Sequence, residues 1–218
     1  MATMVGDNIR ISDSAVMDYV QGNLSPAKHF IIKCQKKMSR HLSERIEFEE
    51  LVASRALAES PNERVVSFSA GDILTKLPKQ DTGLMENEKP IETPHLDKMI
   101  SKVSWRRFIG GISIHNIMGT RRSGGERLYM FNAKPGTVIP EHSHRGDEWV
   151  LVLQGSYTSN GETFRKGDMH IMSGAEQHSL EIGDEGNCIC LAMTEDKVKM
   201  RGFSRVSAKF LLVFKLTF

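Results

Sequence analysis

The sequence predicts a mainly β protein, a jelly-roll-like sandwich or barrel, with a small all-helical unit at its N-terminus. Two observations lead to this fold class. From Trp105 onward, short apolar segments alternate with turn signals such as Pro135-Gly136, Asn160-Gly161 and Gly183-Asp184, which is typical of many short strands. Before residue 80, apolar residues instead recur at three- and four-residue spacing, the period of an amphipathic helix.

These patterns divide the chain into three parts. Residues 1–80 are expected to form the helical unit, residues 81–94 a linker, and residues 95–218 the β domain. The middle part is polar and contains proline and glycine without an apolar period, as linkers do.

Three helices are expected in the first part. The first covers residues 12–22, where Ser12 can cap its start and Gly22 can end it. The second begins at Pro26, and its apolar period continues to about Ala58. A third, short helix is expected over residues 70–77.

One face of the second predicted helix is basic, and acidic residues follow it. We prefer the interpretation of a solvated helix with charge pairs four residues apart over that of a docking surface for a partner protein. The basic residues are Lys28, Lys33, Lys36, Lys37 and Arg40, and the acidic ones are Glu44, Glu47, Glu49 and Glu50.

Seven strands are expected in the β domain. Asn160-Gly161 predicts a two-residue hairpin turn of type I′. The apolar segment 210–218 predicts an edge or closing strand that another surface covers, with a second subunit in a homodimer as one option. The seven strands cover residues 112–118, 127–133, 148–153, the neighbours of Tyr157, 169–172, 178–182 and 188–193.

The composition argues against several classes of protein. The formal net charge of the 218 residues is +2, too small to indicate direct nucleic-acid or membrane binding. No apolar run reaches the roughly 18 residues of a transmembrane helix, and the N-terminus lacks the pattern of a signal peptide. Cys34, Cys188 and Cys190 do not form a disulfide framework. We therefore expect a cytoplasmic protein.

Four side chains predict a divalent-metal site. His142 and His144 are two residues apart, so on a strand they share one face. Gly146 permits a tight turn, and a hairpin would return Glu148 beside the two imidazoles. A second block offers His178. Three imidazoles and one carboxylate suit zinc, iron, manganese or nickel and usually leave coordination positions open.

The two blocks resemble the two cupin motifs. The first has every fixed position of G-x5-H-x-H-x3-E-x6-G, from Gly136 through the histidines and Glu148 to Gly155. The second keeps Gly167 and His178, but has Ser173, Ala175 and Ile182 where the motif has Pro, Gly and Asn. The resemblance implies a cupin jelly-roll β-barrel with His142, His144, Glu148 and His178 as metal ligands.

Nearly the whole chain also resembles the ChrR family of cupin-containing anti-sigma factors. The segments that carry this resemblance are Ile11-Ser12-Asp13, Gly22-Asn23-Leu24-Ser25, His144-Arg145-Gly146, Leu151 to Gly155 and Cys188 to Ala192. It implies a helical domain that sequesters an alternative sigma factor, a cupin that senses a small molecule or oxidant, and zinc as the metal.

The helical part departs from the family at its zinc site. The four ligand positions of the family fall on Arg10, Gln35, Ser39 and Leu42, which are not a zinc ligand set. His29, Cys34 and His41 lie nearby, but His29 and Cys34 occupy rather different helix faces. We therefore expect an anti-sigma-like helical domain that lacks the zinc ligands, in which the sigma factor stays a possible partner.

Several residues near the motifs have two interpretations. Cys188 and Cys190 share a strand face and either sense oxidants or, as we prefer, fill the core. His115 and His170 are kept out of the ligand set as structural histidines. Ordinary core packing is preferred for three aromatic residues that are also candidates to line a cavity, Tyr129, Phe131 and Trp149.

Three functions stay open at this point. The preferred one is a ChrR-like regulator. The alternative is a small metal-dependent cupin enzyme, a dioxygenase, isomerase or lyase, for which Arg145 is the only obvious substrate clamp near the motifs. The third is a binding or storage module without turnover or a protein partner.

Overall fold

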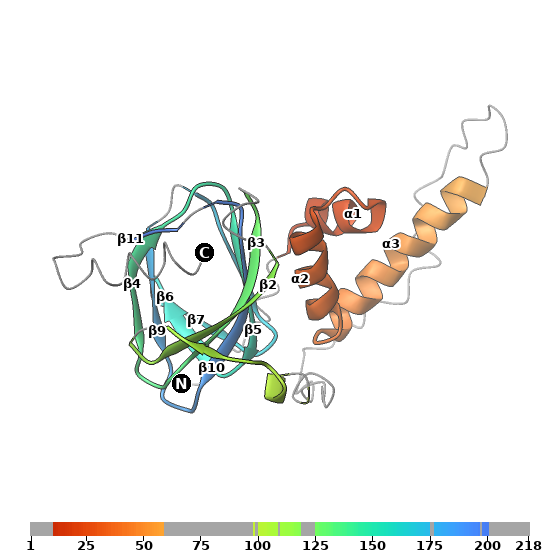
Figure 1. The fold of residues 1–218 in the computed structure, drawn as a ribbon. Coiled ribbons are helices and arrows are strands. Elements are labelled where there is room, and N and C mark those ends of the chain that lie inside the picture. Colours follow the sequence, from red (N-terminus) through yellow and green to blue (C-terminus); the bar gives the residue numbers. More distant parts are fainter. Residues whose placement is uncertain are drawn as a thin grey trace.

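The computed structural model describes residues 11–58, 98, 100–108, 110–118, 125–174, 177–196 and 198–200. Figure 1 shows a β-sandwich with the N-terminal helices on one of its sides. The predicted helix at 70–77, the linker at 81–94 and the predicted strand at 210–218 lie outside the described residues. Among the residues that are described, no helix is both long and apolar enough to cross a membrane.

The first helix confirms the predicted caps. α1 covers Asp13–Gln21, and the Ser12 side chain accepts a hydrogen bond from the backbone N–H of Ala15. Gly22 ends the helix in the left-handed region with φ of 74°, a conformation that costs glycine little.

The long second helix predicted from Pro26 to Ala58 is wrong, because the chain forms two helices there. α2 covers Pro26–Lys36 and α3 covers Arg40–Ala58. Ser39 lies at the break, where its hydroxyl accepts a hydrogen bond from the Leu42 N–H and caps the new helix. The apolar period runs through the break because both helices bury residues in the same core, among them Ile32 and Leu42.

Two antiparallel sheets form the cupin jelly roll, which confirms the predicted fold class. The first has the order β1-β2-β3-β10-β5-β8, and the second has the order β11-β4-β9-β6-β7. The sheets pack face to face rather than closing into one hydrogen-bonded barrel (Figure 1). The strands are β1 Arg106–Arg107, β2 Ile112–Met118, β3 Arg127–Ala133, β4 Val138–Ser143, β5 Glu148–Gln154, β6 Ser156–Ser159, β7 Glu162–Arg165, β8 Met169–Met172, β9 His178–Ile182, β10 Cys188–Thr194 and β11 Lys199–Met200.

The predicted hairpin turn is confirmed between β6 and β7. Ser159 pairs with Glu162, and the two residues between them, Asn160 and Gly161, have φ of 50° and 79°. Positive φ at both central positions is the mark of a type I′ turn.

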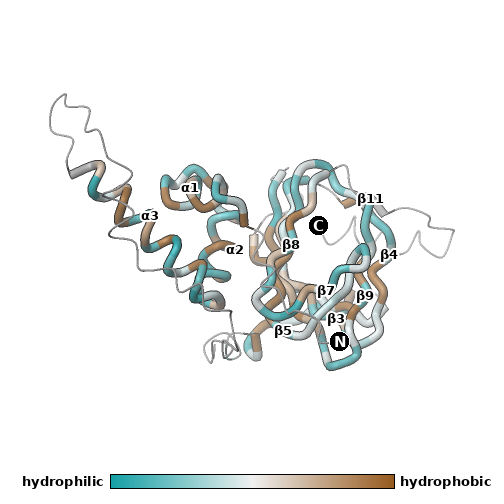
Figure 2. The backbone as a smooth tube through the Cα atoms, turned by 180° about the vertical axis from the view of Figure 1, so that it is seen from behind, coloured by the Kyte–Doolittle hydropathy of each residue, from teal (hydrophilic) through white to brown (hydrophobic). Residues whose placement is uncertain are grey.

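The central strands of the six-stranded sheet are covered on both faces. Side chains alternate along its strands, so Tyr129 and Phe131 of β3 face the second sheet, while Leu128 and Met130 face the helices. α2 packs on β5 and β10, and Figure 2 shows hydrophobic positions on α2 and on the neighbouring strands. Burial on both faces explains why β5 and β10 are continuous apolar runs rather than alternating ones.

Candidate metal centre

The four predicted ligands come from three strands and one loop. His142 is on β4, His144 follows that strand, Glu148 begins β5 and His178 begins β9. The predicted hairpin between the histidines and Glu148 is wrong. β4 pairs with β9 and β11, whereas β5 pairs with β10 and β8. The chain therefore crosses from one sheet to the other between residues 143 and 148, with Gly146 at φ of 75°.

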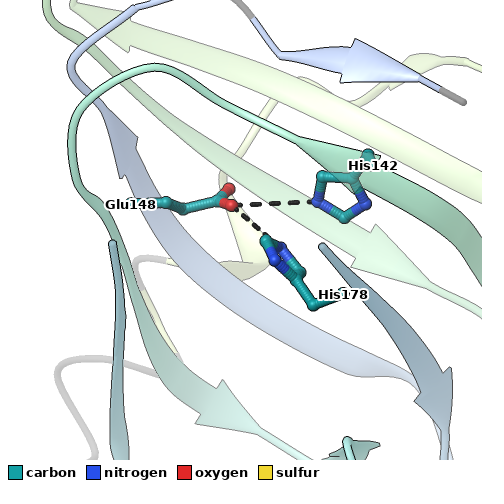
Figure 3. A group of neighbouring side chains, drawn as sticks. All are labelled: His142, Glu148 and His178. Carbon is teal, nitrogen blue, oxygen red and sulfur yellow. Dashed lines mark ion pairs between the residues drawn. The ribbon is translucent and has the colours of Figure 1, made fainter. Parts of the chain in front are cut away.

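The crossing nevertheless brings the four side chains together. Oε2 of Glu148 lies 3.2 Å from Nε2 of His178, 3.5 Å from Nε2 of His144 and 3.8 Å from Nε2 of His142. Figure 3 shows the carboxylate of Glu148 pointing at the rings of His142 and His178. Potential ligand atoms of these three residues all lie within 4.8 Å of one another. All four side chains are buried.

Backbone carbonyls orient two of the imidazoles. Nδ1 of His142 lies 2.8 Å from the carbonyl oxygen of Pro140, and Nδ1 of His144 lies 2.8 Å from that of Gly146. When each Nδ1–H donates to its carbonyl, the lone pair of Nε2 is left free to face the cluster. This is the tautomer that a metal-binding histidine requires.

The cluster contains polar atoms without hydrogen-bond partners. Nε2 of His144, Oε2 of Glu148 and both ring nitrogens of His178 are buried and have no such partner. Buried polar groups without partners are costly and call for an explanation. A divalent cation would satisfy three of these atoms together, and nitrogen and carboxylate donors suit it. The residues therefore fit a metal ion.

The electrostatics keep the carboxylate ionised. Burial alone would raise the pKa of Glu148, but the close imidazoles of His142 and His178 outweigh burial and hold the pKa far below its usual range. Burial would lower the pKa of His142, but its contacts with Glu148 and the Pro140 carbonyl raise it instead. The ionised carboxylate is the form that binds cations, whereas the raised pKa of His142 means that metal binding competes with protonation of this imidazole.

A cavity of about 60 Å³ adjoins the cluster. Its polar boundary consists of His142, Glu148 and Tyr129, whose hydroxyl donates to Oε1 of Glu148 over 3.4 Å. Thus Tyr129 and Phe131 do line a cavity, contrary to the preferred interpretation of ordinary packing. The apolar walls are formed by Phe108, Ile112, Ile114, Phe131, Ile139, Val150, Leu180 and Val198.

Sequence reasoning missed one charged residue of the interior. Arg127 is only 7% exposed, and by alternation along β3 it shares the inner face with Tyr129 and Phe131. Arg145, the clamp proposed from the sequence, is exposed. The two-residue spacing from Arg127 to Tyr129 was the available signal, but it required knowing which face of β3 is internal.

The remaining candidates do not join the cluster. His115 Nδ1 is 3.1 Å from the Ser104 carbonyl oxygen, and His170 Nδ1 is 3.0 Å from the Tyr157 hydroxyl, so both make structural hydrogen bonds. Trp149 belongs to the outer core beneath the helices. Cys188 and Cys190 are buried on the inner face, with their sulfurs 3.6 Å apart.

The residues at the positions of the family's helical zinc ligands make other contacts in this chain. Gln35 is fully buried and its amide donates to the Gly167 carbonyl of the β domain. Leu42 is in the helical core, and Ser39 caps α3. Arg10 lies outside the described residues. In the part of the chain that the structure describes, the one group suited to a metal is the cupin cluster.

Comparisons with known proteins agree with this architecture. Residues 97–197 match the family model described as a ChrR cupin-like domain. The anti-sigma-E factor ChrR of Cereibacter sphaeroides is 24% identical over 205 residues, which is 88% of this chain and 92% of that protein.

Among solved structures, the crystal structure of Rhodobacter sphaeroides SigE in complex with the anti-sigma ChrR matches 87% of this chain and 100% of the compared chain. The TM-score is 0.65 at 23% identity. An RmlC-like cupin from Ralstonia eutropha matches 53% of this chain and 84% of its own, with a TM-score of 0.42 at 14% identity. Residues 97–197 are thus similar to a ChrR cupin-like domain, within a chain that resembles an anti-sigma factor ChrR over most of its length.

Proposed function

We propose that this protein is a metal-binding cupin regulator that controls an alternative sigma factor. Its helical domain, residues 1–80, would bind the sigma factor, and its cupin, residues 95–218, would sense a small molecule or oxidant. The resemblance to a sigma-binding protein over most of the chain supports the partner. One structural observation supports the regulation: the helical unit contacts the loop that carries the candidate metal ligands.

That contact is made by Lys28 of α2. Its Nζ lies 3.1 Å from Oδ2 of Asp147 and 2.7 Å from Oε1 of Glu195. Asp147 is the neighbour of the candidate ligand Glu148, and its N–H donates to the other oxygen of Glu195. The Lys28 ammonium also lies 5.2 Å from the centre of the Trp149 ring. A change in the position of residues 144–148 would therefore reach α2 directly.

The four candidate ligands would hold one divalent cation. His142, His144 and His178 would supply imidazole nitrogens and Glu148 a carboxylate oxygen, and the bound cation would supply an open Lewis-acid position for a ligand. Zinc is favoured by the family resemblance, while iron, manganese and nickel suit the same donors.

A sensed ligand can change how much of the protein is bound to the sigma factor only if its affinity for the cupin differs between the partner-bound and partner-free states.

The helices also offer a surface for a protein partner. Four large apolar side chains of α1, α2 and α3 are exposed: Met17, Phe30, Leu51 and Val52. They would lie within a sigma-factor interface, which typically buries apolar residues at its centre.

Copurification tests the regulatory role. The full chain and its co-encoded sigma factor are expressed together, and complex formation is measured with metal-loaded and metal-stripped protein. We expect a complex that includes the sigma factor, with an affinity that depends on the metal or its ligand. The proposal fails if neither form binds the sigma factor.

The cavity beside the cluster favours a second candidate function, that of a small metal-dependent cupin enzyme. A cavity that adjoins an open metal position suits a substrate as well as a sensed ligand. Turnover of an oxygenated small molecule by iron- or manganese-loaded protein, lost in His142→Ala, would support this function over the regulator.

A further inference from the structure

The inner face of the six-stranded sheet changes from polar to apolar in successive rows. The pairing of β5, β10 and β3 places Glu148, Thr194 and Arg127 side by side. The next row has Val150, Ala192 and Tyr129. The third row, which continues onto β2, holds Val152, Cys190, Phe131 and Ile114.

The polar row contains a buried hydroxyl without a partner. Thr194 is 1% exposed, and its Oγ1 has no hydrogen-bond partner. Alternation along β10 directs the side chain inward, as Ala192 and Cys190 belong to the inner core while Met193 belongs to the outer one. A buried donor without a partner is costly, so this hydroxyl points to a ligand beside the candidate metal ligands.

The charge of this row suits an anion. A divalent ion held by three neutral imidazoles and one carboxylate has a net charge of +1, which one monoanionic group would neutralise. Arg127 shares the row, and although burial raises the pKa of Tyr129, the positive charge of Arg127 lowers it, as expected for a charge near this hydroxyl. Arginine is well suited to a carboxylate because its planar fork donates two parallel hydrogen bonds.

The cavity sets the size and polarity of the rest of the ligand. It extends from Glu148 and Tyr129 to Phe131 and Ile114, and no lining residue beyond the polar end is charged. A volume of 60 Å³ accommodates about four water-sized groups. A second charge or a long polar chain would be left without partners in this part of the cavity.

We propose that the cupin binds a short-chain monocarboxylate, with its carboxylate between the metal, Thr194 and Arg127 and its branched or linear alkyl tail in the cavity. This inference rests on the proposed metal centre and specifies what it senses. Arg127 and Thr194 become ligand-binding residues that neither cupin motif includes.

Calorimetric titration with isobutyrate tests the inference on the full-length, zinc-loaded protein. The matched ligands are isobutyramide, which has the same shape without the charge, and succinate, which adds a second carboxylate. We expect isobutyrate to bind at least about 10-fold more tightly than either. Isobutyramide lacks the charge that strengthens the hydrogen bonds, and the second carboxylate of succinate would be buried without a partner. Removal of zinc should abolish the difference.

Single substitutions test which residues bind the carboxylate and which contact the alkyl tail. Arg127→Met should weaken isobutyrate binding by about 10-fold or more, and the isosteric Thr194→Val by about 5-fold, as expected for one lost hydrogen bond. Ile114→Phe should block the tail without changing the metal content. The control is Arg165→Met on the exposed end of β7, which should change nothing. If Arg127→Met fails to fold, Thr194→Val and Ile114→Phe still decide the result.

The outcomes separate this inference from the proposed function. If the protein binds about one equivalent of zinc but binds isobutyrate and isobutyramide equally well, the monocarboxylate inference is overturned and the proposed function is not. Protein that takes up no metal would overturn both, since the charge argument requires the cation. Tight isobutyrate binding that Thr194→Val and Arg127→Met leave unchanged would also overturn the assignment of this row.

Discussion

Lys28 of the helical unit and Glu195 of the cupin form an ion pair with their Nζ and Oε1 atoms 2.7 Å apart. The pair is partly buried, with 16% of the lysine side chain and 39% of the glutamate side chain exposed. Glu195 also accepts the N–H of Asp147, so the pair ties α2 to the loop that precedes Glu148. Lys33, Lys37 and Arg40 are exposed, as expected for a solvated helix, and Lys36 pairs with Glu50 of α3, so Lys28 is the basic residue of this helix that pairs with the cupin.

Lys28→Met should loosen this connection while keeping an apolar side chain over Trp149. A partly exposed ion pair contributes about 0.2–1 kcal/mol, and two carboxylates lose their cation here. We expect the melting temperature to fall by about 2–4 °C, with faster hydrogen exchange in α2. Lys33→Met, an exposed lysine on the same helix, should have no effect. Equal behaviour of the two variants would contradict the role of Lys28.

The contribution of the pair should depend on pH. Burial alone would raise the pKa of Glu195, but Lys28 and the Asp147 N–H lower it. A lowered pKa means that the stabilisation is complete above the ordinary glutamate pKa and is lost as the pH falls through the lower folded value. Burial would lower the pKa of Lys28, but its two carboxylate partners raise it, so no loss is expected until strongly alkaline pH.

Thermal unfolding of metal-stripped protein measures this dependence. The difference in melting temperature between the parent chain and Lys28→Met should be constant from pH 6 to 8 and shrink as the pH falls below the ordinary glutamate pKa. Stripping the metal first removes the separate effect of acid on the candidate ligands. A difference that does not shrink at acid pH would show that the stabilisation does not come from the ionised carboxylate.

Local chemistry predicted much of the fold. Ser12, Gly22 and Asn160-Gly161 act within a few residues of chain, and each capped or turned the backbone as expected. The break at Ser39 was missed because helices on both sides bury apolar residues in one core, so the period shows no interruption. Periodicity reports the buried face of a segment, not the continuity of its backbone.

The candidate cluster was predictable by residue but not by topology. The spacing of His142, His144 and Glu148 is compatible with a hairpin and with a crossing between sheets, and both bring the side chains together. Arg127 was missed because its role depends on which face of β3 is internal. Thr194 was missed because its row exists only once β10 lies between β3 and β5. Such neighbours come from tertiary pairing, which local sequence does not encode.

His142→Ala should remove the metal. Elemental analysis of the purified parent chain should find about one equivalent of a divalent metal. The variant should bind the metal more than about 100-fold more weakly, a larger loss than is typical for a residue that only hydrogen-bonds to a metal ligand. His115→Ala is the matched control, because His115 is bonded to the Ser104 carbonyl. Two equivalents in the parent chain would show that the helical unit also holds metal.

Gly174→Ala should weaken the same site through the backbone. A Cβ at position 174 would lie 2.5 Å from the Gly146 nitrogen and 2.7 Å from its oxygen, so the loop must move. The Gly146 oxygen is the acceptor for Nδ1 of His144. We expect metal affinity to fall by about 10–100-fold and the free energy of unfolding by about 1–3 kcal/mol.

Gly161→Ala provides the control for that effect. Gly161 has a positive φ of 79°, but a Cβ added at this position of the hairpin turn would meet no other atom within 4 Å. Substitution there should cost about 1–2 kcal/mol of backbone strain and leave metal affinity unchanged. A similar loss of metal affinity in both variants would mean that general destabilisation, rather than the His144 acceptor, controls binding.

The cysteine pair should react only when the protein opens. Cys188 and Cys190 are fully buried, and burial, followed by the neighbouring Cys188 thiol, raises the pKa of Cys190 well above its usual range. Thiolates are the reactive form. Burial also raises the pKa of Cys34, but this thiol is partly exposed, so a disulfide reagent at pH 8 should label it slowly in the folded protein and reach all three thiols only in denaturant. In Cys34→Ser, labelling should follow the rate of unfolding. Rapid labelling of the pair in the folded protein would instead favour the oxidant-sensing hypothesis, because a sensor needs an accessible thiolate.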